Sequence, residues 1–560
     1  MFIDHGFIQN HKKSKKFTIK SNELLEGINY FQDFIIIKKN EQIKIFDRNC
    51  DHAGGKLIKN NNSDNLYCPF HNWEFDAKKG SYTNGIKKKQ IPFKTENNDL
   101  IFFLEELKPV IKKLRPNKKT KTSITYFNHA FLIIEGEGFK FATDPWAIGP
   151  AFNNGWWLKN RTDKDWLKEI NKCDFIYISH NHPDHLNDHT LKKINKNITI
   201  IIPKFEHDSI SGLLKKLRFK KIVLIDINKQ FQFKNTNLIF SILKSGDFRL
   251  DSGIYFSNGN FSSLIDVDTN AINFLRLPNV DLYATSYKGG ASGYPLMFEN
   301  YNQKEKSEII RKKNNFLLKM KLKNILNLKA KYFLPYASAF DEKLVRDKYI
   351  KKNNLKIDIK NYSNFLMKKN IKILDKEKFK KFIFLDKQLI SEVKKSKEYY
   401  KDRSDNYYLN NYKKINSKIS LEYIKKYFQD SNFKDRLVLN IKLTNDDFSK
   451  ELNKFSIDFS NTKPIFNNKL IKNIKDKRIL NLKIRNESFI YTLRNMMPWE
   501  DILIGFQCKV KRSPNIFNSK FWYHFSNIYI NNSRKKYILS CNNCEIIEQK
   551  IDNLIYHSAQ

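Results

Sequence analysis

Apolar and polar residues alternate in short runs over much of the first 260 residues. Runs such as Phe34 to Ile37 and Gln42 to Phe46, separated by Asn, Gly and Asp turns, predict a small β-domain near the N-terminus. A charged stretch at 112–122 contains Pro116 and has no apolar period, so it predicts a linker. From Ser123 onward strands and turns alternate again, which predicts a sheet packed against a second layer.

The spacing of apolar residues changes further along the chain. Helical spacing appears at 304–328, and a strand-like run at 331–340 closes the central part. Strands and helices then mix after residue 416, which predicts an α+β domain. We therefore expect a β-domain at 1–110, a linker at 111–122, a central domain at 123–345, a Lys-rich connecting region at 346–415 and a C-terminal α+β domain at 416–560.

Composition narrows the possible partners. The 560 residues carry a net charge of +43, from 102 Lys and Arg against 59 Asp and Glu. The Lys residues are spread along the whole chain, which indicates a composition bias rather than a nucleic-acid surface, although anionic substrates and acidic partners would be attracted. Six Cys without framework spacing, no signal peptide and no apolar run of about 18 residues predict a cytoplasmic protein without a membrane span.

One short loop concentrates metal-binding side chains. The sequence DFIYISHNHPDHL begins with an apolar run, which predicts a buried strand, and then brings His180, His182, Asp184 and His185 within six residues. The whole chain has only 12 His. Imidazole and carboxylate are ligands for zinc and for non-haem iron, so this loop predicts a metal site.

The order His-x-His-x-Asp-His resembles the metallo-β-lactamase superfamily. That resemblance implies an αββα sandwich, in which these side chains hold one or two metal ions between paired β-sheets. It also implies a bridging carboxylate after the strand-like SSLI, where Asp266 and Asp268 stand, and we favour Asp266. His129 lies between two strand-like runs, and both a core position and a place near the metals stay open.

The same superfamily needs two more His downstream for a two-zinc hydrolase. None occurs between His207 and His524, so a complete two-zinc site is not expected. The remaining side chains match the two-His-one-carboxylate set of non-haem iron oxygenases, although zinc stays possible. Asp247 and Asp251 stand near the place of the missing third His, and Asp247 is our candidate substitute.

A second set of ligands precedes this loop. Cys50-x-His52 and Cys68-x-x-His71 resemble the two loops of a Rieske [2Fe-2S] centre, in which Cys binds one iron and His the other. A zinc site is the alternative. Gly55 and Phe70 occupy the positions where respiratory Rieske proteins carry a disulfide, so the pattern resembles the ferredoxin and oxygenase type, an electron relay rather than a respiratory subunit. The lone pair Cys541 and Cys544 is interpreted as free thiols.

The two ligand sets, in this order, resemble the CMP-N-acetylneuraminate hydroxylase family. DPWAIGPAFNNGWWL, YISHNHPDHL, GGASGYP and WEDILIGFQ carry the same resemblance, over about residues 20 to 540. It implies a monooxygenase that converts the N-acetyl group of CMP-N-acetylneuraminate to N-glycolyl with dioxygen. Electrons would come from an acidic donor, a b-type cytochrome or a ferredoxin with its reductase.

The resemblance also assigns roles to residues. It implies a Rieske cluster on Cys50, His52, Cys68 and His71, and a mononuclear oxygen-activating iron on His180, His182, Asp184, His185 and Asp266, with Asp247 and His129 as further candidates. Two alternatives stay open. One is a UDP-N-acetylmuramate-type hydroxylase, whose Rieske region follows the metallo-β-lactamase region. The other is a metallohydrolase such as a phosphodiesterase or nuclease.

Overall fold

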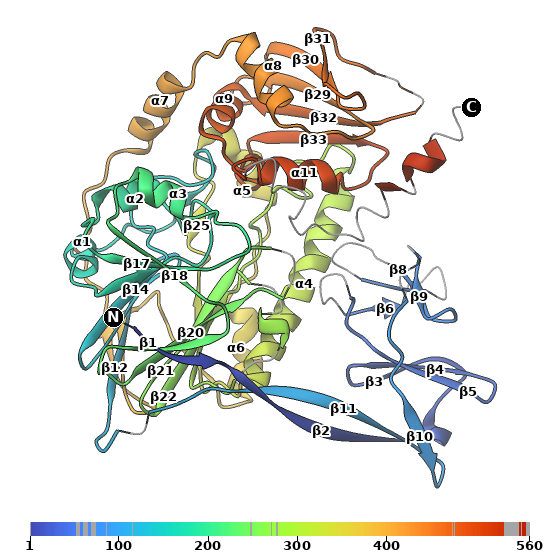
Figure 1. The fold of residues 1–560 in the computed structure, drawn as a ribbon, viewed down its shortest axis with the longest axis vertical. Helices are drawn as coiled ribbons and strands as arrows, with labels where there is room; N and C mark the ends of the chain where they lie inside the picture. The colour runs from blue at the N-terminus through green and yellow to red at the C-terminus, as the bar shows by residue number, and fades with distance from the viewer. Residues whose placement is uncertain are drawn as a thin grey trace.

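A computed structural model gives the fold. It describes residues 2–51, 56–59, 65–68, 74–83, 85, 87–114, 116–246, 249–269, 272–275, 278–472, 474, 476–530, 548–549 and 551–555. The chain forms an N-terminal β-domain, a central sandwich and a C-terminal domain that sits above one end of the sandwich (Figure 1).

Two eight-stranded sheets form the central sandwich. One runs β1 (Phe2–Phe7), β19 (Lys229–Phe233), β20 (Leu238–Lys244), β21 (Ser252–Asn258), β22 (Phe261–Val267), β23 (Leu282–Ser286), β24 (Tyr332–Tyr336) and β26 (Lys372–Ile373). The other runs β18 (Lys221–Ile225), β17 (Thr199–Pro203), β16 (Phe175–Tyr177), β14 (Phe139–Thr143), β13 (Phe131–Gly136), β12 (Lys121–Asn128), β27 (Phe379–Leu385) and β28 (Gln388–Lys394). Aromatic side chains fill the space between them; the rings of Phe141 and Phe175, for example, stack at 5.0 Å.

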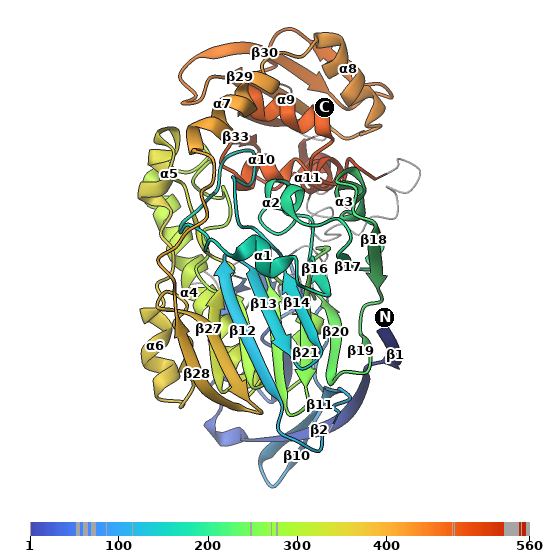
Figure 2. The same ribbon diagram turned by 90° about the vertical axis from the view of Figure 1, so that its left-hand side faces the viewer.

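Helices cover the outer faces of both sheets. Leu191 of α2 (Asp188–Lys193) and Leu214 of α3 (Ser211–Lys216) pack with Trp166 of α1 (Trp166–Ile170) on one face (Figure 2). α4 (Gln303–Asn327) and α6 (Lys360–Met367) cover the other face through Ile325 and Leu366. The predicted αββα sandwich is therefore confirmed.

Two segments lie in the sandwich although the sequence pattern placed them elsewhere. β1 pairs with β19, so the first residues belong to the central sheet and not to the β-domain expected at 1–110. β27 pairs with β12 and β24 with β26, so the expected connecting region at 346–415 supplies three strands. FKKFIFL buries Phe382 and Phe384, and its two adjacent Lys residues, which are half-buried, hid this alternation.

The N-terminal domain is built on a long antiparallel pair, β2 (Gln9–Lys20) and β11 (Asp99–Val110). This pair reaches from the sandwich to two small sheets. One contains β3 (Gly27–Phe31), β4 (Phe34–Lys39) and β5 (Gln42–Asp47); the other contains β6 (Ile58–Lys59), β7 (Leu66–Tyr67), β8 (Glu74–Asp76) and β9 (Ser81–Tyr82). Asp33 pairs with Lys56 at 2.9 Å and with Lys323 of α4, which joins the domain to the sandwich.

The C-terminal domain is α+β, as predicted. Its sheet has the order β31 (Ile465–Asn467), β30 (Glu451–Asp458), β29 (Leu437–Thr444), β32 (Arg478–Arg485) and β33 (Cys508–Ser513). α8 (Leu421–Asp430), α9 (Asn486–Asn495), α10 (Glu500–Ile504) and α11 (Ser519–Ser526) pack on it around Trp499. α7 (Asp405–Ile415) leads into this domain from the sandwich.

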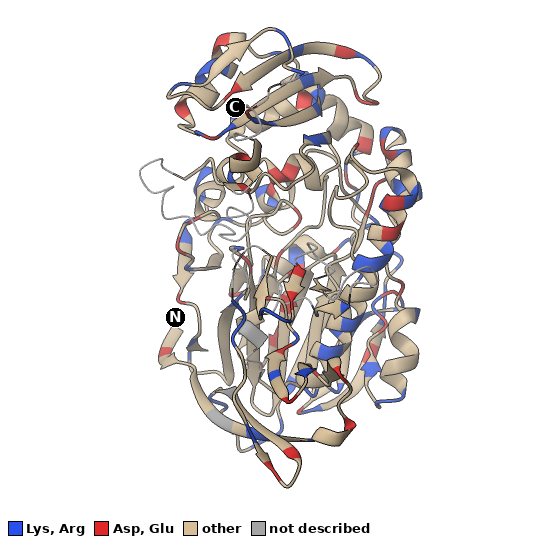
Figure 3. Cartoon of the chain, turned by 90° about the vertical axis from the view of Figure 1, so that its right-hand side faces the viewer, with Lys and Arg blue, Asp and Glu red and all other residues tan. Residues whose placement is uncertain are grey.

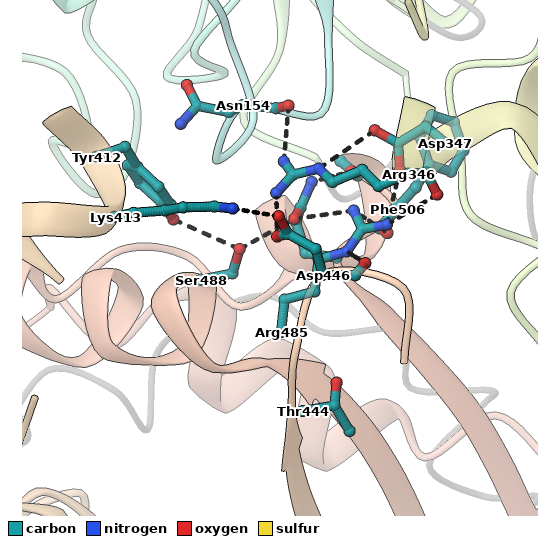
Figure 4. A network of polar contacts seen from close by, with 12 residues as sticks. Asn154, Arg346, Asp347, Tyr412, Lys413, Thr444, Asp446, Arg485, Ser488 and Phe506 are labelled. Carbon is teal, nitrogen blue, oxygen red and sulfur yellow. Dashed lines mark hydrogen bonds and ion pairs between the residues drawn. The ribbon is translucent and has the colours of Figure 1, made fainter. Parts of the chain in front are cut away.

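Buried charges join the C-terminal domain to the sandwich (Figure 4). Arg485 Nη2 donates to Asp347 Oδ1 at 2.8 Å, and Arg346 Nη1 donates to Asp446 Oδ1 at 2.7 Å. Arg485 and Asp347 are buried. Because a buried charge is costly without its partner, these pairs fix how the two domains sit.

The distribution of charged residues and the length of apolar helices indicate what kinds of partner the protein can bind. Lys and Arg lie in all three domains, interspersed with Asp and Glu (Figure 3). This distribution agrees with a composition bias. No helix in the described part of the chain is long and apolar enough to cross a membrane.

Candidate metal centre

The His-rich loop is held at the end of two neighbouring parallel strands. β14 and β16 pair in parallel, and Asp144 follows the first while Ser179 follows the second by two residues. Asp144 accepts hydrogen bonds from Ser179 N at 2.7 Å and from Ser179 Oγ at 2.8 Å. The carboxyl ends of parallel strands are a usual place for ligand sites, and this carboxylate locks the first residue of the loop.

One group of metal-ligand atoms comes from His180, His182 and Asp268, all within 4.8 Å of one another. His180 Nε2 lies 2.9 Å from His182 Nδ1. Two nitrogen ligands that each stand about 2.1 Å from one metal ion lie about 3.0 Å apart at a right angle and about 3.4 Å apart in a tetrahedral site, so this pair is close enough to share an ion. Asp268 adds the carboxylate.

A second group comes from His129, Asp184 and His185, again within 4.8 Å. Asp184 Oδ2 lies 2.9 Å from His129 Nε2 and 3.3 Å from His185 Nε2. Asp268 Oδ2 lies 3.4 Å from the same His185 nitrogen, so it stands between the two groups. The structure thus brings His180, His182, Asp184 and His185 together, and places His129 beside them rather than in a plain core position.

The donor set fits metal cations. Asp184 Oδ1 is buried without a hydrogen-bond partner within the described residues, which is costly unless something binds it. Burial, together with the charges of His185 and His182, holds the pKa of His180 well below its ordinary value, so this imidazole is neutral and ready to bind. Imidazole and carboxylate together are the ligands of zinc and of non-haem iron.

The neighbouring His182 behaves differently. Burial disfavours its charged form, but the Glu500 carboxylate, with Asp251 and Asp184, outweighs burial and raises the pKa of His182 to about 9. A protonated imidazole has no lone pair for a metal, so a cation must displace this proton.

The proton on His182 makes metal binding depend on pH. Between pH 6 and 9 the apparent affinity for a divalent cation should rise with pH, by about tenfold per unit for each proton displaced, and should level off above about pH 9. Equilibrium dialysis at several pH values measures it. An affinity that stayed constant over this range would mean that no imidazole proton is displaced.

Asp266 and Asp268 take different places. A register shift between Ile265 and Val267, with Val267 at φ 55°, breaks the alternation at the end of β22. Asp266 is therefore buried against Tyr283 and lies 3.6 Å from Lys321, while Asp268 faces the imidazoles. This placement does not support our preference for Asp266, and we take Asp268 as the candidate carboxylate ligand instead.

Exchanging each carboxylate should separate the two roles. Asp268→Asn is expected to lower metal affinity by more than about tenfold, because it removes a ligand oxygen. Asp266→Asn should leave metal affinity within about twofold but cost about 1–3 kcal/mol of stability, because Lys321 and Tyr283 lose a buried partner. Dialysis against cobalt(II) and urea unfolding measure the two quantities. The opposite pattern would restore Asp266 as the ligand.

Several predicted residues lie outside the described part of the chain. These are His52 and His71 of the Rieske pattern, Asp247, Cys541 and Cys544. Cys50 and Cys68 are described: both are buried in one apolar cluster of the N-terminal domain, and neither forms a disulfide. Two thiols gathered from two loops suit a shared iron–sulfur cluster.

The sequence did not single out Asp144, although its place after a strand was a usable signal. Asp144 Oδ2 lies 3.2 Å from His185 Nδ1 and orients that ring. Asp251, named as an alternative to Asp247, lies 3.5 Å from His180 Nδ1 and 3.1 Å from Arg249.

A cavity of about 300 Å³ opens beside His182. Arg249 and Asp251 of the sandwich line it together with Trp522 and Tyr523 of α11. Its wall is mostly apolar with a few polar groups, which is typical of a small-molecule site. Trp146 and Trp156 of DPWAIGPAFNNGWWL, in contrast, are buried in a core beside the site, where Trp156 stacks on Phe340 at 3.7 Å.

Comparisons with known proteins cover nearly the whole chain. Residues 13–94 match the Rieske [2Fe-2S] domain, and residues 123–256 match the β-lactamase superfamily domain. Cytidine monophosphate-N-acetylneuraminic acid hydroxylase of Gorilla gorilla gorilla is 30% identical, over 90% of this chain and 90% of its own length. The enzyme of the same name from Asterias rubens is 31% identical, over 85% of this chain and 77% of its own.

Solved structures are similar as well. CmlA, a diiron β-hydroxylase from Streptomyces venezuelae, aligns with 50% of this chain and 55% of its own at a TM-score of 0.32 and 14% identity. A likeness at that level carries no conclusion about the reaction.

Proposed function

The chain belongs to the cytidine monophosphate-N-acetylneuraminic acid hydroxylase family, and from this premise we propose that it hydroxylates the N-acetyl group of CMP-N-acetylneuraminate. The product carries an N-glycolyl group. One observation carries the proposal: a Rieske domain and a His-rich metal centre occur in one chain, in an alignment that spans nine-tenths of it.

The chemistry requires both centres. The methyl C–H bond of an acetamide is strong and weakly acidic, so acid–base catalysis alone does not break it. In the balanced reaction, the methyl group and dioxygen with two electrons and two protons give the hydroxymethyl group and one water. The protein must therefore supply a metal that activates dioxygen and a route for single electrons.

The residues divide between these two roles. Cys50 and Cys68, with His52 and His71, would hold the [2Fe-2S] cluster that relays electrons. His180, His182 and Asp268 would hold one metal ion, and the group around His185 offers a second position beside it. Iron bound there would supply oxygen activation, as in other sites with two imidazoles and a carboxylate.

The cavity beside His182 is the proposed substrate site. Its volume of about 300 Å³ suits the acetamido end of a sugar better than a whole nucleotide sugar, so the CMP group would extend from its open side. Arg249 in its wall offers a cation to an anionic substrate. Trp522 and Tyr523 offer flat apolar faces to a ring.

We place the protein in the cytoplasm with an acidic electron donor. A net charge of +43 would speed association with an acidic protein such as a b-type cytochrome or a ferredoxin. The rate of cluster reduction should then fall as salt rises, because screening weakens the attraction.

A substrate panel tests the proposal. Protein reduced without air is mixed with dioxygen and CMP-N-acetylneuraminate, UDP-N-acetylmuramate or a generic phosphodiester, and oxidation of the cluster is followed optically. We expect fast oxidation with the CMP sugar only. Fast oxidation with the UDP sugar would reassign the substrate. Phosphodiester hydrolysis that is indifferent to cluster reduction would replace the oxygenase by a hydrolase.

A further inference from the structure

Two histidines of the loop share one pattern of contacts. His185 turns Nε2 toward Asp184 and Asp268, and its other nitrogen, Nδ1, lies 3.2 Å from Asp144. His180 turns Nε2 toward His182, and its Nδ1 lies 2.9 Å from Ser179 Oγ. In each ring one nitrogen is directed at the other ligands, and the opposite nitrogen has an outer partner. This is the usual arrangement of a metal-binding imidazole, because the outer partner fixes the ring and its tautomer.

The third histidine completes the pattern with a residue from another domain. His182 directs Nδ1 at His180 Nε2, which leaves Nε2 as its outer nitrogen. The carboxylate of Glu500 faces that atom, with Oε1 at 3.7 Å. Glu500 is the first residue of α10 in the C-terminal domain, more than three hundred positions along the chain.

Glu500 is not itself placed as a ligand. In the part of the chain that the structure describes, neither group of ligand atoms within 4.8 Å of one another includes it. Its side chain keeps 44% of its surface exposed toward the cavity, so the carboxylate has room to adjust against the ring.

α10 is fixed against the sandwich at a close backbone contact. A Cβ added at Gly155 would lie 2.0 Å from the carbonyl oxygen of Gly505, so no larger residue fits there without movement. Trp156 Nε1 donates to the carbonyl oxygen of Ile504 at 3.1 Å. At the other end, Glu500 N donates to Ser526 Oγ at 3.2 Å. These contacts hold Glu500 at a set place above the loop.

We propose that Glu500 is a positioning residue for the metal ligand His182, so that the C-terminal domain is part of the metal centre. A proton on Nε2 of His182 would face the Glu500 carboxylate, 3.7 Å away, which leaves the lone pair of Nδ1 for the metal ion. The inference rests on the metal centre of the proposed function. It gives the motif WEDILIGFQ a physical role, because its Gly lets the domain approach and its Glu acts on the loop.

Metal affinity tests this role without recourse to turnover. The full chain with its cluster is dialysed against cobalt(II), and bound cobalt is counted by mass spectrometry, which separates it from cluster iron. The ion of interest is the one whose binding His182→Ala removes. At about pH 9, where the proton on His182 no longer competes strongly with the metal, we expect Glu500→Gln to weaken its binding by about 10–100-fold, the usual cost of losing an outer partner, and Glu500→Asp to restore part of it.

Glu206→Gln is the matched control. Glu206 lines the same cavity but pairs with Lys244 at 2.6 Å, so its loss should leave cobalt binding within about twofold. The urea midpoint should stay unchanged in Glu500→Gln, Glu500→Asp and Glu206→Gln, because the Glu500 and Glu206 side chains are partly exposed. If the wild type bound no cobalt that His182→Ala removes, the metal centre of the proposed function would fail. If the wild type bound it and Glu500→Gln bound it equally well, the role of Glu500 would be overturned.

Discussion

His180→Ala and His182→Ala are each expected to lower the rate of N-glycolyl product formation by more than about 100-fold, with the Rieske cluster left in place. A direct ligand should cost more than an outer partner, whose loss costs about 10–100-fold. Each ring presents its own nitrogen atom to the shared site, and these two atoms lie 2.9 Å apart. The loss of either ring would therefore leave one ligand position empty. The cluster lies in the N-terminal domain, whose Cys50 and Cys68 belong to a separate core.

Product formation by mass spectrometry and the visible absorption of the cluster measure the two effects separately. His189→Ala is the control, because His189 lies just beyond the loop in α2 and belongs to neither ligand group. It should keep most of the activity. If His180→Ala retained full turnover, the loop would not be the site of oxygen activation.

Arg485→Ala should lower the free energy of unfolding by about 3–5 kcal/mol, because it removes the cation 2.8 Å from the buried Asp347 and leaves that carboxylate only the more distant Arg346, at 3.6 Å. Burial and the neighbouring Arg346 lower the pKa of Arg485 to about 10, yet the guanidinium stays charged at neutral pH. It also donates to the carbonyl oxygens of Asp446 and Phe506, so several bonds are lost together (Figure 4).

Urea unfolding measures this loss of stability, and a double variant tests whether the unpaired charge causes it. Arg485→Met with Asp347→Leu removes both charges and should recover part of the stability. Arg311→Ala, at an exposed position of α4, should change it by less than about 0.5 kcal/mol. If Arg485→Ala lowered the free energy of unfolding as little as Arg311→Ala, the network would not hold the domains together.

The ligand loop and the layer order were accessible from the sequence because their signals are local. Four ligands in six residues follow one apolar strand, and the strands and helices of the sandwich keep clear periods. The choice between Asp266 and Asp268 was not accessible. In a regular strand both side chains would face the same side, and only the shift at Val267 separates them.

Contacts over long sequence separations were equally hidden. No pattern within WEDILIGFQ indicates that Glu500 faces His182, because that contact depends on how two domains dock. The Gly155 and Gly505 contact that allows the docking shows in the sequence only as two ordinary glycines. β27 and β28 were missed for a different reason, since the Lys residues in and around them looked like a solvated connection.

A single turnover with isotopically labelled dioxygen is the sharpest test of the proposed hydroxylation. Protein that has been reduced anaerobically is mixed with ¹⁸O₂ and CMP-N-acetylneuraminate, and the mass of the product is determined by mass spectrometry. We expect one labelled oxygen atom in the N-acyl group, formed only when the cluster starts reduced. An unchanged sugar with an oxidised cluster, or a product whose new oxygen comes from water, would contradict the proposed reaction.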